Sequence, residues 1–261
     1  MEIYLDEISD PIPDEFEKYF RFIENIASGS FGTVMKAINL ENNKLIAVKT
    51  INKFWDKGKQ KNLNKLKQEI TILKQIKHKN IVEFYGFVET SQKLYIMMEY
   101  IHNGTLKNLF EKRKEPKFTE LEAGKLLECL FSAVDYLHTR EICHRDIKPE
   151  NIMFENCNDM NTLKLIDFGL SAQSFDAMEQ HEFCGTLIYM APEQIESKIY
   201  TKSIDIWSCG IIMYMLLNNG IHPLYKKGDK YYDYVQKLKK PKINLKFKMS
   251  RYLYIYNVHF E

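Results

Sequence analysis

The stretch Ile142–Phe154, ICHRDIKPENIMF, constrains the fold more than any other part of the chain. Charged and hydrogen-bonding side chains crowd the positions from His144 to Asn151, and apolar residues flank them on both sides. A solvated charged segment has no reason to lie between apolar flanks, because burying an unpaired charge is costly. The pattern therefore predicts a half-buried loop whose polar groups converge on a chemical task.

The hydrophobic pattern divides the chain into a strand-rich first part and a helix-rich second part. From Tyr19 onward, short apolar runs such as KLIAVKTI predict strands, interrupted by one helix over Lys53–Lys77. The apolar face of that helix would consist of Leu63, Leu66, Ile70, Leu73 and Ile76. After a link near Tyr100–Gly104, a long helix is predicted to begin at Thr119, because Glu122 follows at the spacing of a capping box. The expected fold class is α+β.

Composition excludes several classes of function. A net charge of +2 over 261 residues argues against a dedicated nucleic-acid binder. The five cysteines are odd in number and form no C-x-x-C pair, which favours a reducing compartment without structural zinc. We therefore expect a cytoplasmic protein, with the nucleus as the alternative. The apolar run from Ile206, IWSCGIIMYMLL, is shorter than the roughly 20 residues that span a bilayer, so it predicts a buried helix and no membrane insertion.

Two motifs in the strand-rich part suit phosphate binding. The segment ASGSFGTV, residues 27–34, predicts a glycine turn whose backbone N–H groups can approach a phosphate, although an ordinary hairpin is the alternative. Lys49 lies in an apolar strand after this turn, and Glu69 lies on the predicted helix. A Lys49–Glu69 pair would hold an ammonium ready for a phosphate. A surface lysine and a solvated glutamate are the alternative.

A carboxylate also ends an apolar strand in LKLIDFGLS. Placing the Asp167 carboxylate at the end of an apolar strand costs free energy unless it binds a cation. Together with Asp146 and Asn151 it would supply a base and the oxygen ligands that Mg²⁺ prefers beside phosphate oxygens. The alternative, a set of turn-forming aspartates, does not account for their constrained order and spacing.

The segments IAVK, HRDIKPEN, DFG and MAPE together resemble the eukaryotic protein kinases, over about Tyr19 to Leu224. The resemblance implies a two-lobed protein kinase fold with ATP in the cleft. A small β-rich lobe with one helix, 19–100, would precede a larger, mainly helical lobe, 101–225. Residues 1–18 would be an acidic lead-in and 226–261 a divergent tail rich in Lys and Tyr, so the large lobe looks truncated.

The resemblance also implies roles for individual residues. Asp146 would accept the proton of the substrate hydroxyl, and Lys148 would neutralise charge on the transferred γ-phosphoryl. Lys49, paired with Glu69, would hold the α- and β-phosphates, Asn151 and Asp167 would bind Mg²⁺, and Asp205 would anchor the backbone of the loop. The ATP site would comprise Ile26, Ala27, Ser28, Gly29, Ser30, Phe31, Gly32, Thr33, Val34, Ala47, Lys49, the gatekeeper Met98, Glu99, Ile101 and Met153.

The implied reaction is phosphorylation of Ser or Thr on proteins by ATP with Mg²⁺. Lys148 and Thr186, in CGTLIYMAPE, are typical of Ser/Thr kinases, and the segments DFGLS and CGT favour the calcium/calmodulin-dependent group. A non-catalytic kinase-like scaffold that binds nucleotide or a partner without turnover is the competing class. Glu150 would favour a basic residue near the acceptor, but Thr105 and Met215 supply no matching acids.

The chain departs from the family pattern at three places. The first loop glycine is Ala27, a mild change. Glu182 stands where a phosphorylated residue is usual, and its pairing with Arg145 would remove the need for activation-loop phosphorylation. Beyond residue 225 the expected helices are not recognisable, which would expose apolar surface on the helix containing Ile206 and leave it for a partner. A truncated gene model, a divergent tail that packs in the same place and a short form needing a partner are the three interpretations.

Overall fold

The computed structural model describes residues 18–29, 32–52, 59–90, 93–114, 117–173, 184–196, 200–241 and 243. The chain forms two compact units. The first contains residues up to His102 except Lys79–Ile81, and the second contains those three residues and everything from Asn103 onward. The acidic lead-in falls almost entirely outside the described residues. The predicted α+β class, with a sheet in the first part and helices in the second, is confirmed.

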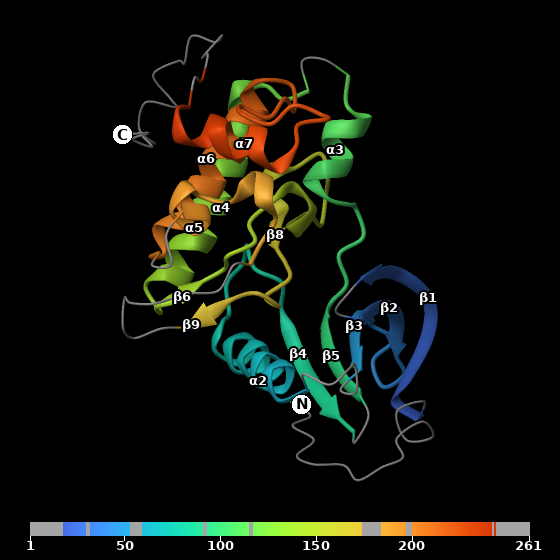
Figure 1. Ribbon diagram of the computed structural model, residues 1–261. Helices are drawn as coiled ribbons and strands as arrows, with labels where there is room; N and C mark the ends of the chain where they lie inside the picture. The colour runs from blue at the N-terminus through green and yellow to red at the C-terminus, as the bar shows by residue number, and fades with distance from the viewer. Residues whose placement is uncertain are drawn as a thin grey trace. The chain divides into compact units, whose positions relative to one another are not determined.

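The first unit is built on one antiparallel five-stranded sheet (Figure 1). Its strands, in spatial order, are β1 (Phe20–Gly29), β2 (Gly32–Asn39), β3 (Leu45–Asn52), β5 (Lys93–Glu99) and β4 (Phe84–Glu89). Helix α2 (Lys59–Gln75) contacts β4. The helix predicted over Lys53–Lys77 is thus confirmed from residue 59 to 75, while residues 53–58 lie outside the described part of the chain.

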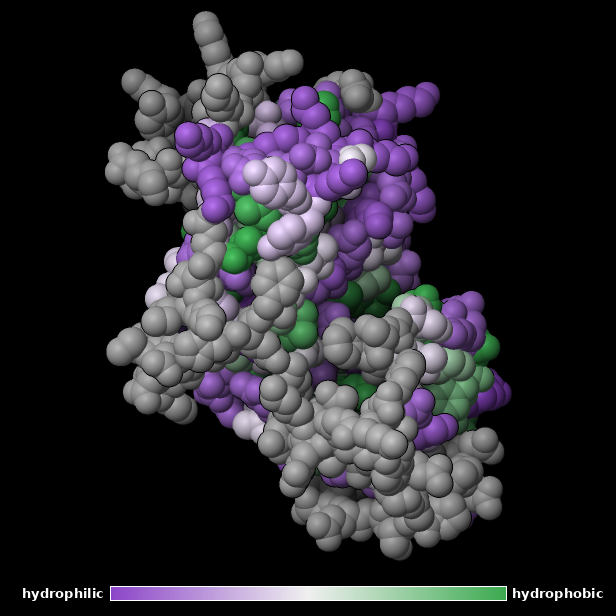
Figure 2. Space-filling view, in the orientation of Figure 1, coloured by the Kyte–Doolittle hydropathy of each residue, from purple (hydrophilic) through white to green (hydrophobic). Residues whose placement is uncertain are grey.

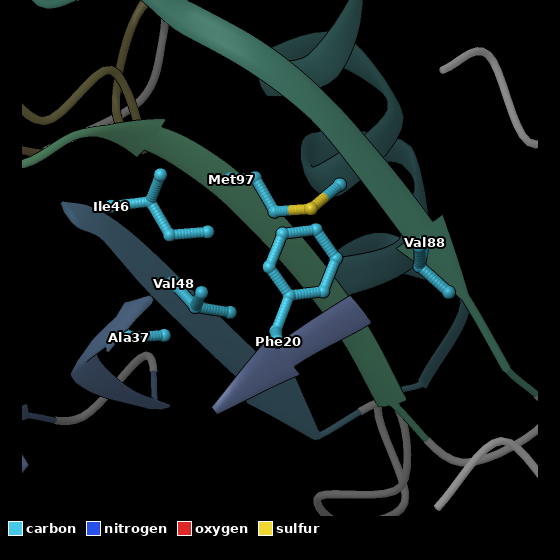
Figure 3. Packing of buried hydrophobic residues seen from close by; sticks show 6 residues of the cluster. All are labelled: Phe20, Ala37, Ile46, Val48, Val88 and Met97. Atoms are coloured by element: carbon cyan, nitrogen blue, oxygen red, sulfur yellow. The ribbon is translucent and has the colours of Figure 1, made fainter. Parts of the chain in front are cut away.

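The hydrophobic core on one face of this sheet shows which side chains of β3 point into the core and which point to the opposite face. Figure 3 shows side chains from four strands and from the start of β1 gathered in one cluster: Phe20, Ala37, Ile46, Val48, Val88 and Met97. Because successive side chains of a strand point to opposite faces, Ile46 and Val48 share the core face. Ala47 and Lys49 therefore share the other face.

The second unit is mainly helical. Its helices are α3 (Leu106–Lys112), α4 (Glu120–His138), α5 (Pro192–Glu196), α6 (Ser203–Leu217) and α7 (Tyr231–Lys239). Two small sheets accompany them, β6 (Ile142–Cys143) with β9 (Ala172–Gln173), and β7 (Ile152–Phe154) with β8 (Leu163–Leu165). The predicted capping box is confirmed at the start of α4: Thr119 accepts from the Glu122 N–H at 3.2 Å, and Glu122 accepts from the Thr119 N–H at 2.8 Å.

Helix α6 is buried along almost its whole length. Its apolar side chains Ile204, Ile211, Ile212 and Leu216 are each at most 1% exposed. A helix that is hydrophobic all round must be enclosed by other elements, so the predicted core helix is confirmed. The prediction that this helix exposes an apolar patch is wrong, because the side chains that would form the patch are buried. In the part of the chain that the structure describes, no helix has the length and hydropathy needed to cross a membrane.

Helix α7 lies in the segment that the sequence pattern set apart as a tail. Its buried residues Tyr234 and Leu238, one helical turn apart, form a cluster with Leu224. Partly buried residues from other segments pack on this cluster: Leu187, Ile188, Ile195, Trp207, Tyr225 and Ile243. The segment that follows residue 225 therefore contributes to the packing of the second unit.

Candidate active site

Lys49 and Glu69 form a buried ion pair in the first unit. Lys49 lies on the central strand β3, opposite Val34 on one side and Ile96 on the other. Its Nζ lies 2.7 Å from Oε1 of Glu69 on α2, and the two side chains are only 12% and 6% exposed. The predicted pair is present, and the alternative of a surface lysine and a solvated glutamate is wrong. A lysine ammonium carries three N–H donors, the kind of group that binds phosphate oxygens.

The glycine turn joins β1 to β2. Gly29 pairs with Gly32 at its base, and Ser30 and Phe31 lie outside the described residues. Gly32 has φ +134°, and a Cβ there would lie 2.0 Å from the carbonyl oxygen of Thr50, so only glycine fits. Ala27 pairs with Val34 in the strand and is exposed, so its methyl group is accommodated without strain.

The remaining residues predicted to line a nucleotide site fall into two groups. In the first unit, Ala47 pairs with Met98 and Ile46 with Glu99 across β3 and β5, and Ile101 follows as a buried residue. The backbone N–H of Glu99 donates to the carbonyl of Glu83 at 2.9 Å. Other members of the set lie in the β1–β2 hairpin: Ile26, Ser28 and Thr33. Met153 lies on β7 of the second unit.

Asp205 on α6 anchors the backbone of the predicted polar loop around Asp146. Asp205 is 1% exposed and accepts hydrogen bonds from the backbone N–H groups of His144 (2.8 Å) and Arg145 (2.9 Å). His138 Nε2 lies 2.9 Å from the same carboxylate. Burial would raise the pKa of Asp205, but the hydrogen bond from His138 and the charges and backbone N–H around it outweigh burial and lower this pKa. The predicted anchoring of the loop by Asp205 is confirmed.

Cys143 lies beside this anchor. Ligand atoms of His138, Cys143 and Asp205 all lie within 4.8 Å of one another, a spacing that would also suit a metal ion. Burial raises the pKa of the Cys143 thiol well above its usual value, and both carboxylate oxygens of Asp205 already accept N–H donors. The chemistry of the group is thus that of a hydrogen-bonded anchor for the loop.

Asp146, Lys148 and Thr186 form a closed triangle of side chains. Lys148 Nζ donates to Asp146 Oδ2 at 2.7 Å and to Thr186 Oγ1 at 2.8 Å, and the Thr186 hydroxyl donates to Asp146 Oδ1 at 2.9 Å. The Asn151 amide adds a third donor, to Oδ2 at 3.1 Å. Asp146 is therefore a buried carboxylate, 8% exposed, that accepts a hydroxyl hydrogen bond beside a cation. This is the geometry that a general base for an alcohol requires.

Asn151 and Asp167 lie at the same end of the β7–β8 hairpin. Ile152 pairs with Leu165, and the N–H of Ile166 donates to the carbonyl of Asn151 at 2.9 Å. The Asn151 amide nitrogen is committed to Asp146, to its carbonyl oxygen at 2.8 Å as well as its carboxylate, so the oxygen Oδ1 is the atom left to offer a cation. Asp167 is exposed, with a left-handed backbone at φ +61°. An amide oxygen and a carboxylate fit Mg²⁺, a hard cation.

The segment after Asp167 packs against the loop. The Phe168 ring lies edge-on to His144 with centroids 5.0 Å apart, and Arg145 donates to the carbonyl of Leu170. Arg145 also reaches the Tyr200 hydroxyl at 3.4 Å, and burial raises the pKa of Tyr200 to about 12. Glu182, predicted to pair with Arg145, lies outside the described residues, so that pairing stays a prediction.

Sequence reasoning missed several residues around this site. His138, Tyr200, His222 and Tyr234 each hydrogen-bond a residue of the loop, its anchor or the segment after Thr186. Each of these contacts joins positions at least 34 apart in the chain. No local motif marks such residues, because their role depends on the elements that packing brings beside them.

Comparison with known proteins agrees with this geometry. The family model described as "Protein kinase domain" matches residues 20–254, which continues past residue 225. The chain is 38% identical to calcium-dependent protein kinase 5 of Plasmodium berghei over 232 residues, 84% of this chain and 40% of the relative. It is 36% identical to mouse serine/threonine-protein kinase 33 over 230 residues, 85% of this chain and 46% of the relative.

A third relative, myosin light chain kinase A of Dictyostelium discoideum, is 37% identical over 212 residues, 81% of this chain and 70% of the relative. The chain spans less than half the length of the first two relatives. The family match covers most of the chain and includes both the Lys49–Glu69 pair and the loop around Asp146. The chain thus belongs to the protein kinase family, and its relatives confirm the predicted resemblance to the Ser/Thr type of the calcium/calmodulin-dependent group.

Proposed function

We propose that the chain transfers the γ-phosphoryl group of ATP to Ser and Thr hydroxyls of proteins. The observation that carries the proposal is the triangle of Asp146, Lys148 and Thr186, in which the carboxylate already accepts a hydroxyl hydrogen bond at 2.9 Å. A substrate hydroxyl has the same donor chemistry as Thr186, so it can donate to the same carboxylate. ATP and Mg²⁺ are the phosphoryl donor and the cofactor that this family uses.

The acidic and basic residues of the site would have different roles in the reaction. Asp146 orients the acceptor hydroxyl and takes up its proton, while Lys148, 2.7 Å from that carboxylate, stabilises negative charge on the transferred group. In the first unit, Lys49 is oriented by Glu69 and donates to the phosphates. Asn151 and Asp167 would hold Mg²⁺, which when bound neutralises phosphate charge.

The substrate would be a protein in a reducing compartment of the cell. All five cysteines are free thiols, which supports the cytoplasmic location predicted from their spacing. The relatives' names, which include a serine/threonine-protein kinase and a myosin light chain kinase, support a protein as acceptor. The net charge of +2 supports no special affinity for nucleic acid.

The test is direct phosphoryl transfer. The purified chain is incubated with Mg·ATP and a general protein substrate, and phosphoamino acids are identified after hydrolysis. The control is Asp146→Asn, which keeps the shape of the side chain but removes the base. We expect phosphoserine and phosphothreonine from the wild type and a loss of at least about a hundredfold in the variant. Folded, nucleotide-binding protein that transfers nothing would support the non-catalytic scaffold instead.

A further inference from the structure

Three side-chain donors converge on two consecutive carbonyl groups just after Thr186. The His222 Nε2 lies 2.8 Å from the carbonyl oxygen of Ile188, and the Tyr234 hydroxyl donates to the same oxygen at 2.7 Å. The Ser208 hydroxyl donates to the carbonyl oxygen of Tyr189 at 2.9 Å. Ser208 belongs to α6, His222 to the loop after α6, and Tyr234 to α7. A carbonyl that accepts two donors is held in position and direction.

The hydrogen positions on His222 follow from its neighbours. Its Nδ1 accepts the backbone N–H groups of Leu224 (3.1 Å) and Tyr225 (2.8 Å), so Nε2 must carry the ring hydrogen and donate it to Ile188. Burial lowers the pKa of His222 to about 4, so the ring is neutral at physiological pH. The ring of Tyr234 lies edge-on to His222 at 6.1 Å, and Tyr234 is only 1% exposed. Both donors are thus fixed by packing.

The Ile188 carbonyl, which accepts both hydrogen bonds, belongs to the turn that directly follows Thr186. Ile188 is the middle residue of the 3₁₀ turn Leu187–Tyr189, and the Tyr189 N–H donates to the carbonyl of Thr186 at 2.8 Å. Thr186 in turn donates its hydroxyl to Asp146 and accepts from Lys148. A change in the position of the turn therefore changes the position of the Thr186 hydroxyl at the carboxylate.

We infer that Tyr234 and His222 are positioning residues of phosphoryl transfer, because they hold the Leu187–Tyr189 turn and so keep Thr186 against Asp146. The inference rests on the proposed function and extends it to α7, a helix in the segment 226–261 that sequence analysis set apart as a tail. Figure 2 shows that the surface over α7 and α3 is mostly hydrophilic, so α7 acts through its buried side rather than through an apolar outer face. Tyr234 and Leu238 form that buried side.

The primary variant is Tyr234→Phe, which removes one hydroxyl and keeps the ring in the cluster. Its matched control is Tyr232→Phe, on the same helix, where the side chain is 69% exposed. Two readouts apply: kcat and KM for a peptide acceptor and for ATP, and hydrogen exchange of the Tyr189 amide, which reports on the turn without requiring activity. His222→Gln tests the second donor, and each variant's denaturant midpoint shows that it is folded.

Tyr234→Phe is expected to lower kcat/KM for the peptide about five- to tenfold, the loss that one hydrogen bond supplies, and to leave KM for ATP within about twofold. Exchange of the Tyr189 amide is expected to accelerate by a similar factor. In a Thr186→Ala background the same change should have no further effect on kcat/KM, because the group that the turn positions is then absent.

Additive effects of Tyr234→Phe and Thr186→Ala, or unchanged exchange at Tyr189, would overturn the positioning role and leave Tyr234 as a packing residue. Should the wild type transfer no phosphate while Tyr234→Phe still accelerates exchange, the proposed kinase function fails but the hold on the turn stands. The two ideas therefore fail separately.

Discussion

Oδ1 of Asp205 on α6 accepts the backbone N–H of Arg145 at 2.9 Å, and the Asp205 residue is only 1% exposed. The other oxygen accepts the backbone N–H of His144. The loop that carries Asp146, Lys148 and Asn151 is thus held to the core by hydrogen bonds from its backbone to a carboxylate on α6. Because Arg145 has a left-handed backbone, at φ +66°, the loop needs such an external hold.

Asp205→Asn should destabilise the chain and almost abolish transfer. An amide presents an N–H₂ group to backbone donors that require an acceptor, and its neutral oxygen bonds them more weakly. We expect the free energy of unfolding to fall by about 3 kcal/mol, measured by chemical denaturation, and kcat to fall at least about a hundredfold. Asp135→Asn, at an exposed position of α4, is the control and should change neither quantity.

Lys49→Met should remove activity and also destabilise the fold. The variant leaves Glu69, 5% exposed, without its ammonium partner, and an uncompensated buried charge costs about 3–5 kcal/mol. Because the Lys49 ammonium would no longer donate hydrogen bonds to the phosphates of ATP, kcat should fall at least about a hundredfold in a steady-state assay. Lys36→Met breaks a comparable pair, Lys36 with Glu24 at 3.0 Å, but Glu24 is 58% exposed. Equal losses in the two variants would contradict a special role for Lys49.

Gly185→Ala should impair transfer much more than Gly228→Ala. Both residues have left-handed backbones, at φ +106° and +100°, so both variants pay the same conformational strain. A Cβ at Gly185 would lie 2.7 Å from the carbonyl oxygen of Arg145, whereas nothing lies within 4 Å of one at Gly228. We expect kcat/KM to fall at least about tenfold for Gly185→Ala only. Comparable kinetics in the two variants would show that the contact with Arg145 is unimportant.

His222 should make the chain sensitive to mild acid. Its pKa of about 4 when folded lies below the ordinary 6.5, so the unfolded chain binds the proton more readily between these values. Stability is therefore full above pH 6.5 and decreases as the pH falls towards 4, by about 3 kcal/mol at most. Denaturation curves across this range should show a shallower decrease in His222→Gln. His102→Gln, at an exposed histidine, should follow the wild type.

Lys107→Ala should increase the use of peptides with a basic residue near the acceptor. Lys107 on α3 lies 3.1 Å from Oε1 of Glu150, so the carboxylate predicted to favour a basic residue already has a cation. The two side chains are 52% and 39% exposed, and such pairs are worth at most about 1 kcal/mol. The preference for basic over neutral peptides should thus increase by no more than about fivefold. Lys112→Ala, exposed on the same helix, should not alter it.

Local signals in the sequence predicted local structure well. The capping box at Thr119 depends on residues three apart, and the glycine turn depends on one short hairpin, so both are readable from spacing. The Lys49–Glu69 pair spans twenty positions, yet it was predictable because an ammonium in an apolar strand requires a partner. The pairing of Asp205 with the loop followed from the family resemblance rather than from spacing.

In the second unit, the wrong expectation for the surface of α6 and the missed contacts of α7 have a common physical origin. The apolar surface of α6 was expected to be exposed because the helices that cover it were not recognisable, but burial depends on what packs around a helix. Helix α7 shows only two fully buried positions, Tyr234 and Leu238, among lysines and exposed tyrosines. Its hold on Ile188 joins positions 46 apart, and no periodicity reports such a contact.

The tie between Asp205 and Arg145 also has a consequence for synthesis. The backbone of the loop is made 60 residues before the carboxylate that holds it. At about 5–20 residues per second the ribosome adds those residues in roughly 3–12 seconds. Throughout that interval the nascent loop lacks the carboxylate that accepts the backbone N–H groups of His144 and Arg145. The order of synthesis therefore means that the loop around Asp146 cannot be anchored before helix α6 has been made.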